Sequence, residues 1–327
     1  MRRRDFLCLL GAATAAWPLR LAAQQGGRRH RIGILETIPP EANAANLNAL
    51  LKGLRELGYV EGQNLAIEYR SAQGDATRFP QLASELVSLN VDVLVTRGTP
   101  AAIAARAAPG TIPVVMAAIG EPLGVGVVSE LSRPGGKVTG LSAFVTELAG
   151  KRVELLREMI PGLKRLGFMH NMGNPVVPPQ WEETKKAAAL LQVDVRLFDV
   201  RAPEDIARAF ETARAERIEA LAVGIDGLIQ ANRRQIIDLA AQHRLPVMYA
   251  SREFMDDGGL IAYGVSYPNL YFRAATLIDK VLKGVKPADL PVEQPTKFET
   301  VVNLKAAKAI GLDIPESFLF RAEEVIE

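Results

Sequence analysis

Short polar segments that directly follow predicted strands carry the residues best suited to binding a small molecule. The strongest case is Gly98, Thr99 and Pro100, which follow a strand predicted over residues 91–96 and open a helix predicted over 101–108. Threonine is a common N-cap and proline is common at the first helical position, with Thr99 and Pro100 expected in those places. Backbone N–H groups at a helix start can bind an anion such as a carboxylate. A turn in which Thr99 only caps its helix is an equally good interpretation.

Polar side chains follow the other predicted strands in the same way. Because the carboxyl ends of parallel strands meet at one edge of a sheet, these segments are expected to surround a single cleft. Asp226 could pair there with the ammonium group of a ligand, and Ser, Thr and Asn side chains could donate or accept directional hydrogen bonds. Caps and turns are an equally good interpretation of each residue, since Asn and Asp favour turns. The other polar candidates for ligand contact are Glu36, Thr37, Glu121, Asn171, Asn174, Ser251 and Arg252.

Two aromatic residues complete the set of candidate ligand contacts. Phe144 and Tyr263 lie near the ends of predicted strands, where a ring could stack on a bound molecule. Core packing is the more usual role of such residues. Trp181 is the only tryptophan beyond the first 23 residues and falls within a predicted helix, so no platform for stacking a sugar is evident.

The sequence lacks the spacing patterns of common enzymes. A dinucleotide-binding pattern that begins at Gly124 lacks its third glycine. A nucleophile elbow that begins at Gly140 has Phe144 where its second glycine is required. There are three histidines, far apart, and the single cysteine, Cys8, lies near the N-terminus. We therefore expect a protein that is not an enzyme, with no metal site and no cofactor.

Length and charge narrow the class of protein further. The chain has 327 residues, 48% of them hydrophobic, which is enough for about two domains with their own cores. Residues 1–23 hold four Arg and one Asp, so the remainder carries 35 basic and 36 acidic side chains. A nearly neutral body argues against binding to nucleic acid, which needs a basic face.

The N-terminal segment predicts export from the cytoplasm. Three arginines at positions 2–4 precede an apolar run over 6–17, which is too short to span a bilayer but typical of a signal peptide. Arg3 and Arg4 with the following residues are similar to the twin-arginine export pattern. We expect cleavage after Ala23 and a soluble, periplasmic mature protein. A buried N-terminal helix is the alternative interpretation.

Strand-like and helix-like segments alternate along the rest of the chain. Residues 30–144 contain five predicted strands with helices between them, which describes a parallel, doubly wound sheet. The alternation restarts near residue 147 and predicts a second sheet of the same kind. We also expect a helix over 122–131 and a final strand over 298–304. The sequence thus predicts an α/β protein with two doubly wound parallel-sheet lobes and a ligand cleft between them.

Several longer segments point to a known family. The longest are LPVEQPTKFE over residues 290–299 and LSRPGGKVTGLS over 131–142. Together with the shorter segments they span nearly the whole chain. They resemble the tryptophan/tyrosine-type group of bacterial ABC transporter substrate-binding proteins. The shorter segments are GYVEGQN (58–64), GTP (98–100), KRVELL (151–156), HRLP (243–246), REF (252–254), GGL (258–260), YG (263–264), AIGL (309–312) and IP (314–315).

The resemblance implies a periplasmic-binding-protein fold of type I, in which the chain crosses three times between two lobes. We place these crossings near residues 144–147, 265–269 and 292–297. Glycine and proline close to these positions would set the geometry of the connections. The expected lobes are residues 24–145 plus 266–292 for the first and 146–265 plus 293–327 for the second.

The resemblance also implies a function. Such proteins capture a small solute, close around it, and present it to an inner-membrane permease that a separate ATPase powers. The sequence has no nucleotide-binding motif or membrane span of its own beyond the leader, which agrees with that division of work. We expect a monomer that binds an amino acid-like solute.

Two other functions stay open. A periplasmic ligand-sensing subunit of a signalling receptor would use the same closure, and an exported enzyme would need a catalytic pair in the cleft. Where relatives commonly have Gly-Asp-Pro, this chain has Glu121 between Gly120 and Pro122. The segment from His170 to Pro175 also departs from the usual pattern. Both differences lie at the predicted cleft and leave the identity of the solute open.

Overall fold

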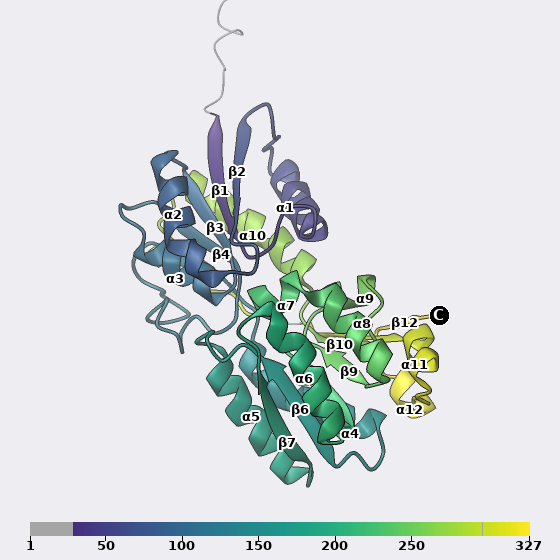
Figure 1. Cartoon of the computed structure of the whole chain (residues 1–327). Coiled ribbons are helices and arrows are strands. Elements are labelled where there is room, and N and C mark those ends of the chain that lie inside the picture. Colours follow the sequence, from purple (N-terminus) through teal and green to yellow (C-terminus); the bar gives the residue numbers. More distant parts are fainter. Residues whose placement is uncertain (1–28, 296) are drawn as a thin grey trace, which may run out of the picture.

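Residues 29–295 and 297–327, described by a computed structural model, form two lobes (Figure 1). Each lobe is built around one sheet that has helices on both of its faces. The predicted signal peptide, residues 1–23, lies outside the described residues. Within the described part of the chain, no helix combines the length and the apolar character that a membrane span requires.

The first lobe contains a five-stranded parallel sheet in the order β2-β1-β3-β4-β5. Its strands are β1 (His30–Glu36), β2 (Leu65–Ser71), β3 (Val93–Arg97), β4 (Val114–Ile119) and β5 (Val138–Ser142); its helices are α1 (Ala44–Glu56), α2 (Phe79–Ser88), α3 (Thr99–Ala107) and α10 (Tyr267–Leu282), with 3-10 turns η1 (Ala76–Arg78) and η2 (Pro287–Asp289). Helices cover both faces, so β3 and β4 are continuous buried runs. Val93 and Val95 belong to the cluster of α1 and α10, whereas Leu94 belongs to that of α2 and α3 (Figure 1).

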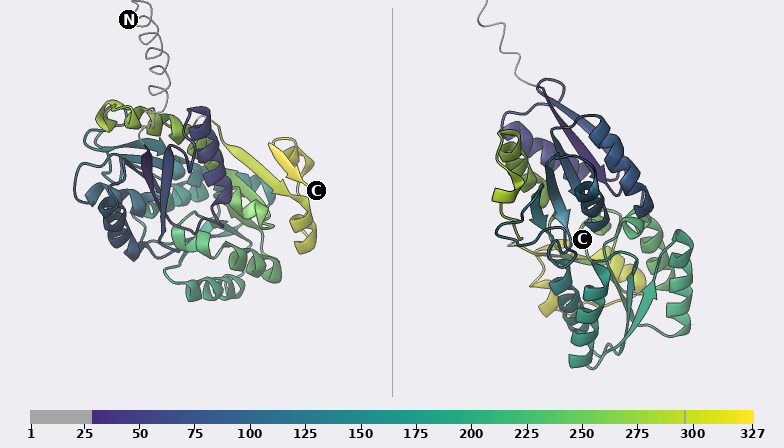
Figure 2. Two further views of the ribbon diagram at one scale, coloured as in Figure 1. Left: turned by 90° about the horizontal axis from the view of Figure 1, so that it is seen from above. Right: turned by 90° about the vertical axis from the view of Figure 1, so that its left-hand side faces the viewer.

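The second lobe contains a seven-stranded sheet in the order β12-β11-β10-β9-β8-β6-β7. Its strands are β6 (Arg165–His170), β7 (Asp194–Asp199), β8 (Ala220–Val223), β9 (Val247–Tyr249), β10 (Ile261–Gly264), β11 (Glu299–Asn303) and β12 (Glu324–Ile326); its helices are α4 (Val145–Met159), α5 (Val177–Leu190), α6 (Pro203–Ala215), α7 (Gly227–Ala231), α8 (Arg233–His243), α9 (Glu253–Asp256), α11 (Leu304–Ile310) and α12 (Glu316–Leu319). Phe168 packs with α4 and α5, whereas Met169 packs with α6 and α8 on the other face. The C-terminal segment from α11 to β12 lies at one edge of this sheet (Figure 2).

The chain crosses between the lobes three times, as predicted. The crossings run from β5 to α4, from β10 to α10, and from η2 to β11. The predicted fold class is therefore confirmed, with one correction: β11 runs antiparallel to β10, and β12, which pairs in parallel with β11, shares that reversed direction. The strand β10 ends at the boundary between the lobes, and β11 starts from that boundary after the third crossing. It can join the sheet beside β10 only in the opposite direction.

The helix predicted over 122–131 is absent, and this prediction is wrong. These residues form turns and bends, with a single helical hydrogen bond, from the N–H of Val125 to the carbonyl of Glu121, that does not continue along the segment. Gly124 and Gly126 explain the difference, because glycine disfavours a helix interior. Gly126 adopts a φ of 69°, which a helix cannot include.

A close approach between two strands of the first sheet depends on Gly140. Its φ is 148°, and a Cβ built there would lie 2.2 Å from the carbonyl oxygen of Met116 in β4. The obstacle is backbone rather than a flexible side chain, so it cannot rotate away. Only glycine fits this position of β5.

We expect Gly140→Ala to lower the free energy of unfolding by about 2 kcal/mol or more, because the added methyl group forces β4 and β5 apart. Gly150→Ala is the matched control: a Cβ at Gly150, inside α4, has its nearest neighbour at 3.5 Å. Helix propensity should then leave stability unchanged or raise it by up to about 1 kcal/mol. Urea unfolding followed by circular dichroism measures both variants, and equal losses would contradict this interpretation.

Candidate functional site

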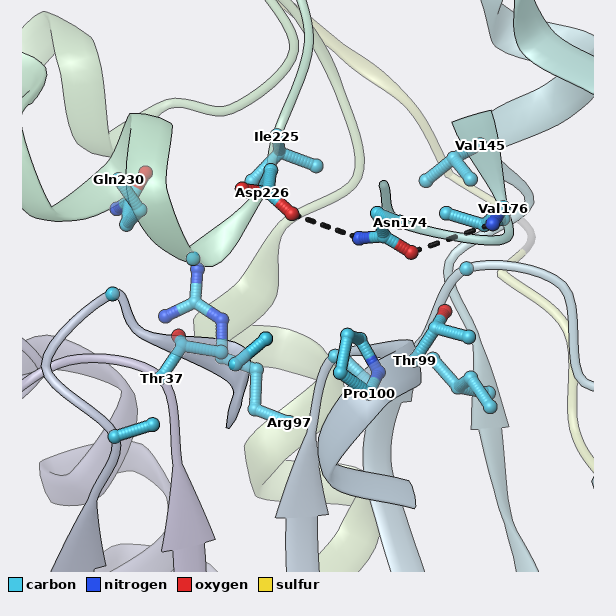
Figure 3. Close-up of a pocket in the computed structure, with 18 of the residues that line it drawn as sticks. Thr37, Arg97, Thr99, Pro100, Val145, Asn174, Val176, Ile225, Asp226 and Gln230 are labelled. Atoms are coloured by element: carbon cyan, nitrogen blue, oxygen red, sulfur yellow. Dashed lines mark hydrogen bonds between the residues drawn. The ribbon is translucent and has the colours of Figure 1, made fainter. Parts of the chain in front are cut away.

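A pocket lies between the two lobes, at the C-terminal ends of the strands of both sheets (Figure 3). Its empty volume, including open solvent at the mouth, is about 660 Å³. The first lobe contributes the loops after β1, β2, β3 and β4, and the second contributes those after β6 and β8. The cleft between the lobes is thus where the parallel sheets require it to be.

Thr99 lies on the first-lobe wall of this pocket, at the start of α3. Gly98 is the N-cap, with a φ of 84°, so Thr99 is the first helical residue rather than the predicted cap. The Thr99 side chain is buried, and its hydroxyl oxygen has no hydrogen-bond partner among the described residues. The first N–H groups of a helix also lack partners within the helix. An acceptor group of a ligand in the pocket could accept hydrogen bonds from the Thr99 hydroxyl and from these N–H groups.

Asp226 lies across the pocket from Thr99, on the second lobe (Figure 3). It is the N-cap of α7 and accepts a 3.0 Å hydrogen bond from the backbone N–H of Leu228. The side-chain amides of Asn171 and Asn174 donate to its two oxygens at 3.2 Å and 2.9 Å. These bonds hold the carboxylate in place, and its remaining acceptor capacity can bind a cationic group.

The pocket between these polar ends is mostly apolar. Phe79 of α2 is 2% exposed, and small or branched side chains from both lobes complete the wall. An apolar wall with few polar groups favours a ligand that has charged ends and a hydrophobic body. The other apolar residues of the wall are Ala72, Ala76, Pro100, Ala118, Ile119, Val145, Val176 and Ile225.

Arg97, which sequence reasoning missed, forms part of the same wall. Its Nη2 lies 2.6 Å from Oε2 of Glu253, and its guanidinium carbon lies 4.5 Å from the centre of the Tyr267 ring. Burial alone would lower the pKa of Arg97, but the carboxylates of Glu253 and Glu36 raise it well above its ordinary value. Arg97 is therefore a permanent charge. In the sequence, the place of Arg97 directly before Gly98, at the end of an apolar strand, is the feature that could have predicted its position in the pocket wall.

Glu36 is fully buried behind the pocket and does not line it. Its oxygens accept hydrogen bonds from the backbone N–H of Thr37 at 2.7 Å, from the Thr37 hydroxyl at 3.0 Å and from the Asn43 amide at 2.9 Å. The hydroxyl of Tyr271 donates to it as well. Burial outweighs the lowering effect of Arg97 and of these donors, so the pKa of Glu36 is raised. Glu36 thus positions Thr37 in the wall.

The thirteen predicted contact residues therefore divide into two groups. Thr37, Gly98, Thr99, Pro100, Asn174 and Asp226 line the pocket together. The other predicted residues lie outside its wall. Besides Glu36, these are Glu121, Phe144, Asn171, Ser251, Arg252 and Tyr263.

The residues outside the wall have other partners. Arg252 pairs with Glu324, with Nη2 and Oε1 2.8 Å apart, so it ties α9 to β12. The ring centre of Tyr263 lies 6.4 Å from that of Phe298, and the Phe144 ring lies 6.5 Å from the same residue. Ser251 donates a 3.1 Å hydrogen bond to Glu253.

Glu121 and Asn171 flank the pocket. Glu121 is half-buried, and burial together with the charge of Glu147 raises its pKa. Asn171 does not line the pocket itself, but its side-chain amide donates a hydrogen bond to Asp226, which does.

No group of three or more His, Cys, Asp or Glu residues that could hold a metal ion occurs among the described residues.

Comparison with known proteins decides the family. Residues 31–326 match the model of the family described as ABC transporter substrate binding protein. The chain belongs to this family. A curated relative of this substrate-binding protein is a tyrosine-binding protein from Clostridioides difficile (strain R20291). The two are 26% identical over 285 residues, which cover 87% of this chain and 82% of the relative.

Two solved structures resemble this substrate-binding protein along most of its length. An ABC domain from Streptococcus pneumoniae in complex with L-Trp is 30% identical, with a TM-score of 0.83 over 91% of this chain and 100% of that one. The ligand-free, open structure of a substrate binding protein with adhesive properties from Clostridium difficile is 26% identical. Its TM-score is 0.65 over 91% of this chain and 99% of that one. The two-lobe fold is thus that of type I periplasmic binding proteins.

His170 makes the stability of the pocket region sensitive to pH. This residue ends β6, is fully buried, and accepts a 3.0 Å hydrogen bond from the N–H of Asn171 at Nδ1. Burial lowers the pKa of His170 to about 4, and the nearby charge of Asp226 opposes this only in part. The imidazole is therefore neutral in the folded protein at neutral pH.

We expect the free energy of unfolding to fall as the pH falls from about 6.5 to about 4. In this window the unfolded chain binds a proton at His170 that the folded protein does not bind. The full difference corresponds to roughly 3 kcal/mol. His170→Gln should flatten this part of the curve of unfolding free energy against pH, which urea unfolding at successive pH values measures. The control is His243→Gln: His243 is half-buried, and its variant should keep the slope. An unchanged slope in His170→Gln would assign the effect to other groups.

Proposed function

We propose that this protein is the exported solute receptor of an ABC-type importer and that it captures an amino acid-like solute by closure of its two lobes. The carrying observation is the placement of Thr99 and Asp226 on opposite lobes of one pocket. The α3 start with the unpartnered Thr99 hydroxyl suits a carboxylate, and Asp226 suits an ammonium group. The apolar wall between them suits a hydrophobic side chain.

The relatives support this choice of solute class. One is a tyrosine-binding protein and another is a structure in complex with L-Trp. Both solutes have the carboxylate, the ammonium group and the apolar body that the pocket suits. The differences in sequence around Glu121 and His170 leave the choice of amino acid to experiment.

A closed arrangement of the lobes also has support. This chain has a higher TM-score with the L-Trp complex, 0.83, than with the ligand-free, open structure, 0.65, although 91% of this chain is covered in both comparisons. Capture by closure requires a solute that binds the closed arrangement better than the open one. A solute that contacts Thr99 and Asp226 at once has that property, because only closure brings the two together.

The leader and the family support a proposal for the cellular setting. We propose export guided by residues 1–23, cleavage after Ala23, and work as a monomer in the periplasm. The proposed partner is an inner-membrane permease with its separate ATPase. The relatives of this chain are substrate-binding proteins, and we propose that it binds its solute without turnover.

The first experiment is a thermal-shift screen of residues 24–327 after partial unfolding and refolding, which removes solute carried through purification. Amino acids and other small solutes are added one at a time. A solute at 100 times its dissociation constant should add about 2.7 kcal/mol of stability. A folded protein that responds to no amino acid would overturn the proposed solute class.

We expect Asp226→Asn to weaken binding of the solute that the screen identifies by about tenfold to a hundredfold, because a charge-assisted hydrogen bond is lost while the cap of α7 is kept. Thr99→Val removes only the hydroxyl and should weaken binding by about threefold to tenfold. Isothermal titration calorimetry measures both.

Asp199→Asn is the control for these variants. Asp199 ends β7 and accepts a 2.9 Å hydrogen bond from the backbone N–H of Met172, outside the pocket. Its variant should bind the solute as the unchanged protein does. Equal affinities in all three variants would remove Thr99 and Asp226 from the site.

A further inference from the structure

One carboxylate of the second lobe reaches across to the first. Glu253 opens α9, and its side chain is buried. Its Oε2 lies 2.6 Å from Nη2 of Arg97, and its Oε1 accepts a 2.6 Å hydrogen bond from the Asn46 amide. Both partners belong to the first lobe. Glu253 itself does not line the pocket, so it joins the lobes without a place in the wall that a solute would touch.

Each lobe holds its own member of this ion pair. In the first lobe, the guanidinium of Arg97 lies over the ring of Tyr267, at the start of α10. In the second lobe, the hydroxyl of Ser251 donates to Glu253 at 3.1 Å, and the amide of Gln230 donates to the same carboxylate. The two charges are therefore already positioned when the lobes meet, and little side-chain freedom is lost on pairing.

The pair is charged in the closed arrangement. Burial alone would raise the pKa of Glu253, but the positive charge of Arg97 and the hydrogen bonds from that residue and Asn46 lower it. When lobes separate, water can solvate both charges. When they close, each charge loses water and gains the other. Removing the charge of Glu253 leaves Arg97 buried without this carboxylate, which penalises only the closed arrangement.

We propose that Glu253 is a positioning residue for closure: it holds the second lobe against the first through Arg97 and Asn46, and it sets solute affinity without contacting the solute. The proposal rests on capture by closure, as proposed above. Its test needs no solute, so its failure and a failed solute screen are separate results.

A disulfide can report closure directly. Thr37 in the first lobe faces Gly227 in the second, and a Cβ built at Gly227 would lie 3.4 Å from Cβ of Thr37. Two cysteines at this separation can form a disulfide with little adjustment, whereas separated lobes cannot. Cys8 is the only cysteine of the chain, so C8S leaves the introduced pair as the only thiols.

The experiment uses the full chain with C8S/T37C/G227C, equilibrated in buffers of reduced and oxidised glutathione. Oxidised glutathione accepts the two electrons as the protein disulfide forms and two reduced glutathione molecules are released. The equilibrium constant of this exchange reports the population of the closed arrangement. We expect E253Q to lower the constant by about tenfold or more, and N46A, which keeps the ion pair, to lower it by a few fold.

The matched control is D257N, next to the same helix. Asp257 pairs with Arg233 and Arg234, all within the second lobe, so this variant removes a carboxylate without touching the boundary between the lobes. Its constant should equal that of the C8S/T37C/G227C protein. Circular dichroism identifies a variant that does not fold, and N46A then decides the question.

Three results would overturn the proposal. One is an equilibrium constant that neither E253Q nor N46A changes. Another is an equal decrease in E253Q and D257N, which would indicate a general loss of structure. The third is a C8S/T37C/G227C protein that forms no disulfide in any glutathione buffer, because the lobes then do not meet through this pair without solute.

Discussion

A guanidinium group buried between two lobes needs carboxylates within reach, and this requirement organises the centre of the molecule. Arg97 is 4% exposed, and an unpaired charge there would be strongly destabilising. Its charge is balanced by Glu253 from the second lobe and by Glu36 in the first. Glu36 in turn fixes the backbone and hydroxyl of Thr37 in the pocket wall. The same set of polar contacts therefore shapes the pocket and joins the two lobes.

The direction of the parallel strands explains why the pocket lies where it does. Each parallel strand ends at the same edge of its sheet, so the loops that carry Thr37, Thr99, Asn174 and Asp226 meet there although they are far apart in sequence. The three crossings then turn the two edges toward each other. The exceptions are β11 and β12, which have no such loop in the pocket; the direction of β11 follows from its return across the boundary, and β12 pairs with it in parallel.

The sequence predicts those features that depend on residues close together along the chain. Alternating strands and helices predicted both sheets, and the position of Thr99 and Asp226 after a strand predicted their place in one pocket. The helix predicted over 122–131 does not form, because Gly124 and Gly126 lie in its interior and Gly126 adopts a positive φ. Glu253 is 156 positions from Arg97, and no local pattern pairs the two. Arg252 illustrates the opposite error: it follows a strand, but its side chain turns toward Glu324 at the far edge of the sheet.

The pairing of Arg97 with Glu253 also affects how much binding free energy a solute must supply to close the lobes. A buried ion pair contributes little net free energy, since the loss of water around both charges roughly offsets their attraction. Charges that are solvated when the lobes are apart and paired when they meet therefore leave the two arrangements close in free energy. A solute then shifts the population by its differential affinity alone. Removing one charge upsets this balance, because the other is still buried on closure and nothing compensates for its lost water. On this proposal, affinity has two separable parts, one at the residues that contact the solute and one at Glu253, where selection can tune binding strength without altering which solute is chosen.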